Sequence, residues 1–177
     1  MKRIFLTLMM MVGLMSETSA AFELDKENTL YLDLEFGRVV IAMRPDAAPN
    51  HVARVKELVR EGFYDGVTFH RVIPGFMAQT GDPTGTGMGG SGKKIDAEFN
   101  NLPHLRGTVS MARADDPNSG DSQFFICFDR SSFLDGSYTA WGRVVGGMEF
   151  VDMIAVGEPP AEPSKIVKMQ VAADGKE

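Results

Sequence analysis

The segment Phe69-His70-Arg71-Val72-Ile73-Pro74-Gly75-Phe76-Met77-Ala78-Gln79 contains one arginine and one glutamine among large apolar residues, around a Pro-Gly break. An arginine among apolar side chains costs free energy unless an anionic or hydrogen-bonding group meets it. The break predicts two strands, 67–73 and 77–80, and on the second strand Met77 and Gln79 share one face. We therefore expect Arg71 to meet a substrate.

Alternating apolar and other residues predict further short strands. Residues 29–36 are typical, because every second residue is leucine or phenylalanine. Apolar residues at helical spacing predict two helices, 48–60 and 147–156. The other predicted strands are 38–43, 108–112, 123–128, 138–145 and 166–171. Roughly eight strands and two helices that do not alternate with them predict a mainly β fold, closed into a barrel.

Residues 81–101 are rich in glycine and show no sustained periodicity, which predicts a long loop. Within this loop, 85–90 match G-x-G-x-x-G, and 87–93 match most of a phosphate-binding loop, with Lys94 where serine or threonine belongs. Both motifs need a preceding strand and a helix that opens after them. The residues directly before and after these motifs predict neither the strand nor the helix, so we interpret the segment as a mobile glycine loop.

The histidines and acidic residues do not form a recognisable metal or catalytic motif. His51, His70 and His104 have no metal-ligand spacing with a cysteine or carboxylate. No local nucleophile signature indicates a hydrolase. We interpret the acidic loop residues as a solvated face: Asp96, Glu98, Asp115, Asp116 and Asp121. The sequence therefore predicts a protein without a metal or cofactor.

The chain has 177 residues and a formal net charge of −6, which fits one acidic domain. General binding to nucleic acid or to anionic lipid normally uses a basic face, so we expect neither. Cys127 is the single cysteine, which excludes an internal disulfide. Its place in the apolar run 124–128 predicts a small hydrophobic side chain packed in a strand.

The first residues have the layout of a secretory signal peptide. Lys2 and Arg3 precede an apolar run at 4–14, and small and polar residues follow. This run is too short to cross a hydrocarbon core of roughly 30 Å comfortably. We predict a signal peptide at 1–20 with cleavage after Ala20 or Ala21, a folded domain at 28–172 and a frayed tail at 173–177. The processed chain would be periplasmic or secreted, without a membrane anchor.

The residues around Arg71 suit the isomerisation of a peptide bond before proline. Rotation about an amide bond has a barrier of about 18–20 kcal/mol. In the twisted state the nitrogen lone pair leaves conjugation, so a donor aimed at it stabilises that state more than the planar one. The side chains that suit the proline ring and the peptide backbone are Phe76, Met77, Phe125 and Leu134, and Gln79 and Gln123. From the pattern alone, such phenylalanines and methionines are more often core residues, and such an arginine is more often a surface residue.

The segment 69–79, with Gly107-Thr108-Val109-Ser110-Met111-Ala112 and Ser122-Gln123-Phe124-Phe125-Ile126, resembles the cyclophilin family of peptidyl-prolyl cis-trans isomerases. The likeness runs from Leu30 to Val171. It implies a closed eight-stranded antiparallel barrel capped by two helices, with the site on the outer surface. It implies that Arg71 is the catalytic donor. The substrate-binding residues that it implies are Phe76, Met77, Gln79, Ala112, Arg113, Gln123, Phe125, Phe133, Leu134 and Tyr138.

Two positions depart from the pattern of many family members. Phe133 stands where they have tryptophan, and Tyr138 stands where they have histidine, which suggests the bacterial branch. Because Phe133 lacks an indole N–H donor, we expect weak cyclosporin binding.

We predict an exported, monomeric prolyl isomerase whose partners are proline-containing peptides and exported proteins during folding. Two alternatives remain open. The same groove fits a binding module for proline-containing segments with little turnover. A structural or interaction protein that uses the barrel surface is the other alternative.

Overall fold

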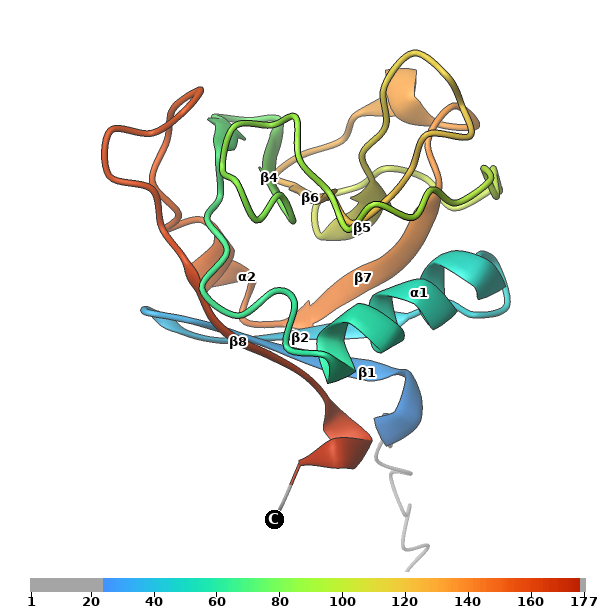
Figure 1. The fold of residues 1–177 in the computed structure, drawn as a ribbon, viewed down its shortest axis with the longest axis horizontal. Helices are drawn as coiled ribbons and strands as arrows, with labels where there is room; N and C mark the ends of the chain where they lie inside the picture. The colour runs from blue at the N-terminus through green and yellow to red at the C-terminus, as the bar shows by residue number, and fades with distance from the viewer. Residues whose placement is uncertain (1–23, 176–177) are drawn as a thin grey trace, which may run out of the picture.

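The computed structural model describes residues 24–175, so the predicted signal peptide and its cleavage site lie outside the described residues. Among the described residues, no helix is long and apolar enough to span a bilayer. A strongly curved sheet forms the body of the molecule, and the helices lie around it (Figure 1).

Eight strands form one sheet in the order β3-β4-β6-β5-β7-β2-β1-β8, and the paired strands are antiparallel. The sheet confirms the predicted mainly β class. The strands in chain order are β1 (Thr29–Leu34), β2 (Gly37–Met43), β3 (Arg71–Ile73), β4 (Met77–Thr80), β5 (Thr108–Met111), β6 (Phe124–Cys127), β7 (Ala140–Gly146) and β8 (Ile166–Val171).

The sheet curls into an open half-barrel, so the prediction of a closed barrel was wrong. The edge strands β3 and β8 do not pair with each other. Residues 67–70, which were predicted as part of a strand, lie between these two edge strands. They form only isolated backbone contacts and no ladder. Thr68 makes an isolated bridge with Lys165, and the Phe69 N–H donates to the carbonyl oxygen of Ser164 at 2.9 Å. A few isolated backbone bonds span the gap, and no continuous ladder closes it.

Two α-helices flank the sheet, as predicted, but the second is shorter than its pattern suggested. Helix α1 (Pro49–Arg60) lies against β8, and its apolar side buries Val52, Val55 and Leu58. Helix α2 (Met148–Val151) lies against β2. The chain beyond α2 tightens into i→i−3 hydrogen bonds, including one from the Ile154 N–H to the Val151 carbonyl at 3.2 Å, which ends the α-helical pattern.

The concave side of the sheet holds the main hydrophobic core. Its largest fully buried members are Trp141, Tyr64, Phe69 and Phe124. The Tyr64 hydroxyl is satisfied by the backbone carbonyl of Ser122 at 2.9 Å. A second, smaller cluster contains Met77, Phe125, Cys127 and Leu134 and does not belong to the main core.

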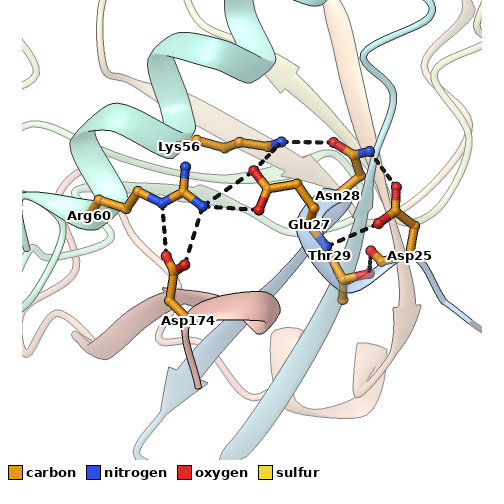
Figure 2. A network of polar contacts seen from close by, with 7 residues as sticks. All are labelled: Asp25, Glu27, Asn28, Thr29, Lys56, Arg60 and Asp174. Atoms are coloured by element: carbon orange, nitrogen blue, oxygen red, sulfur yellow. Dashed lines mark hydrogen bonds and ion pairs between the residues drawn. The ribbon is translucent and has the colours of Figure 1, made fainter. Parts of the chain in front are cut away.

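Polar side chains tie both ends of the described chain to α1 (Figure 2). Arg60 donates to Asp174 at 2.8 Å and to Glu27 at 3.0 Å. Lys56 donates to Glu27 at 3.0 Å and to Asn28 at 2.8 Å. Asp174 lies in a 3-10 turn (Ala172–Asp174), so the first part of the predicted frayed tail is an ordered turn that is ion-paired to the domain.

Candidate active site

The strands β3, β4 and β6 present alternate residues to two sides of the sheet. Val72, Ala78 and Ile126 enter the main core. The intervening residues, including Met77 and Phe125, lie on the other side in the second cluster. In the register Arg71 is opposite Gln79, and Gln79 is opposite Phe125. The face that the sequence assigned to Met77 and Gln79 therefore carries the candidate site.

A cavity of about 440 Å³, here called the main cavity, opens on this outer face. It brings together nine of the predicted site residues, which come from β3, β4, β6 and the loops beside them: Arg71, Phe76, Met77, Gln79, Ala112, Arg113, Phe125, Leu134 and Tyr138. Met77 and Phe125 are buried in the second cluster, and Phe76 packs against it partly buried, yet all three border this cavity. Packing in this cluster therefore does not remove these side chains from the cavity wall.

Arg71 is the first residue of the edge strand β3, and its side chain is 42% exposed. Its Nε donates to a carboxylate oxygen of Glu158 at 2.8 Å. Among the described residues, Glu158 is the only hydrogen-bond partner of the Arg71 guanidinium. A guanidinium has five N–H donors, so those on the two terminal nitrogens remain available to a ligand in the main cavity.

Two glutamines connect the site to the glycine-rich loop. The Gln79 amide donates to the side-chain oxygen of Gln123 at 2.9 Å. The Gln123 amide in turn donates to the carbonyl oxygens of Gly87 at 3.0 Å and Gly89 at 2.8 Å. Gln123 does not line the main cavity, but it borders a neighbouring cavity of about 430 Å³ together with Gln79. The predicted pair of glutamines is therefore present and held in place.

Asp82 organises the glycine-rich loop, which the sequence analysis interpreted as mobile. Its buried carboxylate accepts backbone N–H bonds from Thr84 at 2.7 Å, Thr86 at 3.1 Å, Gly87 at 2.6 Å and Gly89 at 3.1 Å. Burial alone would raise the pKa of Asp82. The hydrogen bonds from Thr84, Gly89 and Gly87 outweigh it and hold the pKa well below its ordinary value.

The sequence and the fold both match known prolyl isomerases. The model of the family described as "Cyclophilin type peptidyl-prolyl cis-trans isomerase/CLD" matches residues 29–171. A probable peptidyl-prolyl cis-trans isomerase from Brucella suis is 49% identical and aligns with 93% of this chain and 91% of its own length. Peptidyl-prolyl cis-trans isomerase B from Bacillus subtilis is 45% identical over 73% of this chain and 92% of its own.

The chain belongs to the cyclophilin family. It is a peptidyl-prolyl cis-trans isomerase of the cyclophilin type. Among solved structures, cyclophilin AquaCyp293 from Hirschia baltica has a TM-score of 0.80 and 33% identity, and covers 86% of this chain and 77% of its own. A Cryptosporidium parvum cyclophilin crystallised in the presence of the dipeptide Ala-Pro has a TM-score of 0.76 and 29% identity, over 81% of this chain and 98% of its own.

Aromatic rings form part of the apolar lining of this cyclophilin's site. Phe125 packs edge-on against Tyr138, with ring centroids 5.9 Å apart. Phe133 does not line the main cavity. It is 70% exposed, and its ring lies 5.4 Å from the ring of Phe76, which does line it. Phe133 therefore extends the apolar surface at the rim.

Arg113 gives the cyclophilin groove a second cationic residue. Its guanidinium lies 4.6 Å from the centroid of the Tyr138 ring and donates to the Ser137 carbonyl at 3.0 Å. Together with Ala112 it borders both cavities. These contacts fix Arg113 beside the boundary between the two cavities.

Six residues of the main cavity were not predicted from the sequence: His70, Gly85, Thr86, Gly87, Glu158 and Pro159. His70 adjoins Arg71 in the chain, which was an available signal. Burial lowers the pKa of His70, and both of its ring nitrogens are buried. No local signal points to Glu158, which reaches the site only through the contact of residues 157–159 with β3.

Proposed function

We propose that Arg71 accelerates rotation about Xaa-Pro bonds by donating to the substrate from its terminal guanidinium nitrogens. The observation that carries this proposal is an arginine with available donors beside a cavity of about 440 Å³ that is partly lined by apolar side chains. Such a donor stabilises the twisted amide more than the planar one. Raising the rate from about 10⁻² to about 10³ per second requires roughly 7 kcal/mol. One donor to the transition state supplies about 3–4 kcal/mol of this.

The proposed substrate is a proline-containing peptide in an extended conformation. Phe76, Met77, Phe125 and Leu134 would hold the proline ring, and Tyr138 would complete the apolar wall. Gln79, Gln123, Ala112 and Arg113 would hold the peptide backbone along the groove toward the second cavity, with Phe133 at the rim. Binding of proline-containing peptides is supported by the related Cryptosporidium parvum structure, which was determined in the presence of Ala-Pro.

We propose further that the enzyme is exported and assists the folding of periplasmic or secreted proteins as a monomer without a cofactor. The support is the basic, apolar and small-residue order of residues 1–21. The full-length chain with a C-terminal tag should fractionate outside the cytoplasm and begin at Ala21 or Phe22. A matched chain without residues 2–20 should stay in the cytoplasm, and export of this chain would contradict the proposal.

Isomerisation of a short Xaa-Pro peptide tests the catalytic proposal. Arg71→Ala should lower kcat/KM by about 10²–10³, the cost of removing one donor to the transition state. Arg143→Ala is the matched control, because Arg143 is an exposed arginine of β7 away from both cavities. Equal activity of the two variants would contradict the role of Arg71. A folded chain that binds the peptide but does not accelerate its isomerisation would support the binding-module alternative.

A further inference from the structure

We infer that Glu158 is a positioning residue that holds the guanidinium of Arg71 in the orientation that catalysis requires. This inference rests on the catalytic role proposed for Arg71. Glu158 accepts the Nε hydrogen of Arg71 at 2.8 Å, and both residues line the main cavity. A guanidinium is planar, so fixing Nε also fixes the plane in which the two terminal nitrogens present their donors.

The backbone around Glu158 is itself attached to the strand that carries Arg71. Val72 and Gly157 exchange two backbone hydrogen bonds, of 2.8 Å and 3.0 Å. The loop is closed farther along, where the Ala155 N–H donates to the Ser164 hydroxyl at 3.0 Å. In Figure 1 this loop, in orange-red, stands beside the green strands β3 and β4. Glu158 therefore reaches Arg71 from an anchored segment.

No other described side chain replaces Glu158 in this role. Gln79 lies opposite Arg71 in the register, but no hydrogen bond joins the two side chains; the Gln79 amide donates to Gln123, and the Gln123 amide donates to the glycine-rich loop. The backbone carbonyls of that loop thus orient the glutamines, and Glu158 orients the arginine. Two separate sets of contacts therefore hold the site. Only the contact from Glu158 acts on Arg71, the proposed catalytic donor.

The ion pair contributes little to the stability of the fold, because its side chains are 42% and 52% exposed and water screens the attraction. A peptide in the main cavity would exclude part of that water and strengthen the contact. The pair is thus best placed to act during catalysis. An arginine released from Glu158 would sample several orientations, and only a fraction of them would present donors to the substrate.

Three variants distinguish the hydrogen-bond acceptor of Glu158 from its negative charge. Glu158→Ala removes the acceptor, and kcat/KM should fall about tenfold, mainly through kcat, because loss of orientation costs about this much or more. Glu158→Gln keeps an acceptor oxygen and should retain activity within about threefold of the wild type. Glu162→Ala is the matched control, because Glu162 is an exposed glutamate in the same loop and does not line the main cavity. It should leave both kinetic constants unchanged.

A double-mutant cycle tests whether Glu158 acts through Arg71. In the Arg71→Ala background, Glu158→Ala should change kcat/KM by less than about twofold, since no guanidinium remains to be oriented. An equal loss in both backgrounds would overturn the inference, as would unchanged or higher activity of Glu158→Ala in the wild-type background.

The two proposals fail in different ways. A folded wild-type chain that does not accelerate isomerisation contradicts the catalytic role of Arg71. An active wild-type chain that loses activity with Arg71→Ala but keeps it with Glu158→Ala contradicts only the role of Glu158.

Discussion

Replacing Asp82 by asparagine tests the support of the glycine-rich loop, and through it the support of the site. One carboxylate oxygen of Asp82 accepts from the backbone N–H and the hydroxyl of Thr84, both at 2.7 Å. The other accepts from the N–H groups of Thr86 at 3.1 Å, Gly87 at 2.6 Å and Gly89 at 3.1 Å. Asp82→Asn keeps the shape of the side chain but removes the charge and one acceptor oxygen.

The magnitude follows from the bonds that asparagine cannot make. The Thr84 hydroxyl can turn to accept, so the new NH₂ group should face Thr84 and leave that residue's backbone N–H without an acceptor. Because Thr84 is exposed and its bond to Asp82 is only partly buried, the loss of this acceptor costs about 1 kcal/mol, and the remaining bonds lose the extra strength of a charged acceptor. We therefore expect the free energy of unfolding to fall by about 3 kcal/mol.

Urea unfolding at pH 7 measures this loss. Asp96→Asn is the matched control, because Asp96 is an exposed aspartate farther along the same loop, and its replacement should change stability by less than about 0.5 kcal/mol. The activity of Asp82→Asn should also fall, since the carbonyl groups of Gly87 and Gly89 hold Gln123.

The dependence of the free energy of unfolding on pH provides a second measurement. The pKa of Asp82 in the folded chain lies below its unfolded value, so the unfolded chain takes up the proton first as the pH falls. The contribution of Asp82 is complete above about pH 4 and is lost progressively below it. The stability gap between the wild type and Asp82→Asn should therefore narrow below about pH 4. Equal stability at pH 7, or a gap that is constant down to pH 2, would refute this reasoning.

Two further predictions concern single side chains, one in the second cluster and one at the rim of the site. Cys127→Ser should lower the free energy of unfolding by about 1–3 kcal/mol in urea titration, because a hydroxyl without a partner would replace a thiol buried in the second cluster. Phe133→Trp should tighten cyclosporin binding about tenfold in calorimetry, because the indole adds one donor at an exposed rim position. A serine variant as stable as the wild type would contradict the first prediction, and unchanged affinity would contradict the second.

Local sequence patterns predicted most of the strands, because each is marked by alternation or by a short apolar run such as Phe124–Cys127. The strand Ile166–Val171 begins and ends at its predicted residues, and Met77–Thr80 does as well. Cys127 is buried in its strand as predicted. Helix α2 was predicted too long, because apolar spacing from Met148 to Ala155 does not distinguish an α-helix from a helix that continues into tighter turns.

The open edge of the half-barrel and the contact of Glu158 with Arg71 could not be predicted from local pattern, for one shared reason. Both depend on how residues 155–165 meet residues 67–72, which are far apart in the chain. The apolar residues at 67–73 suited a strand, but only Arg71–Ile73 pairs with a neighbour in a ladder. Glu158 lies in a proline-rich segment with no chemical motif of its own, and contacts Arg71 because Gly157 bonds to Val72.

The central claim is that Arg71 is the donor that catalyses prolyl isomerisation. The most direct measurement is the rate of cis-to-trans conversion of an Ala-Pro-Phe-type peptide with the wild-type chain and with Arg71→Ala, both verified as folded by circular dichroism. We expect strong acceleration by the wild type and a loss of about 10²–10³ in kcat/KM in the variant. A folded Arg71→Ala variant as active as the wild type would contradict the catalytic role of Arg71.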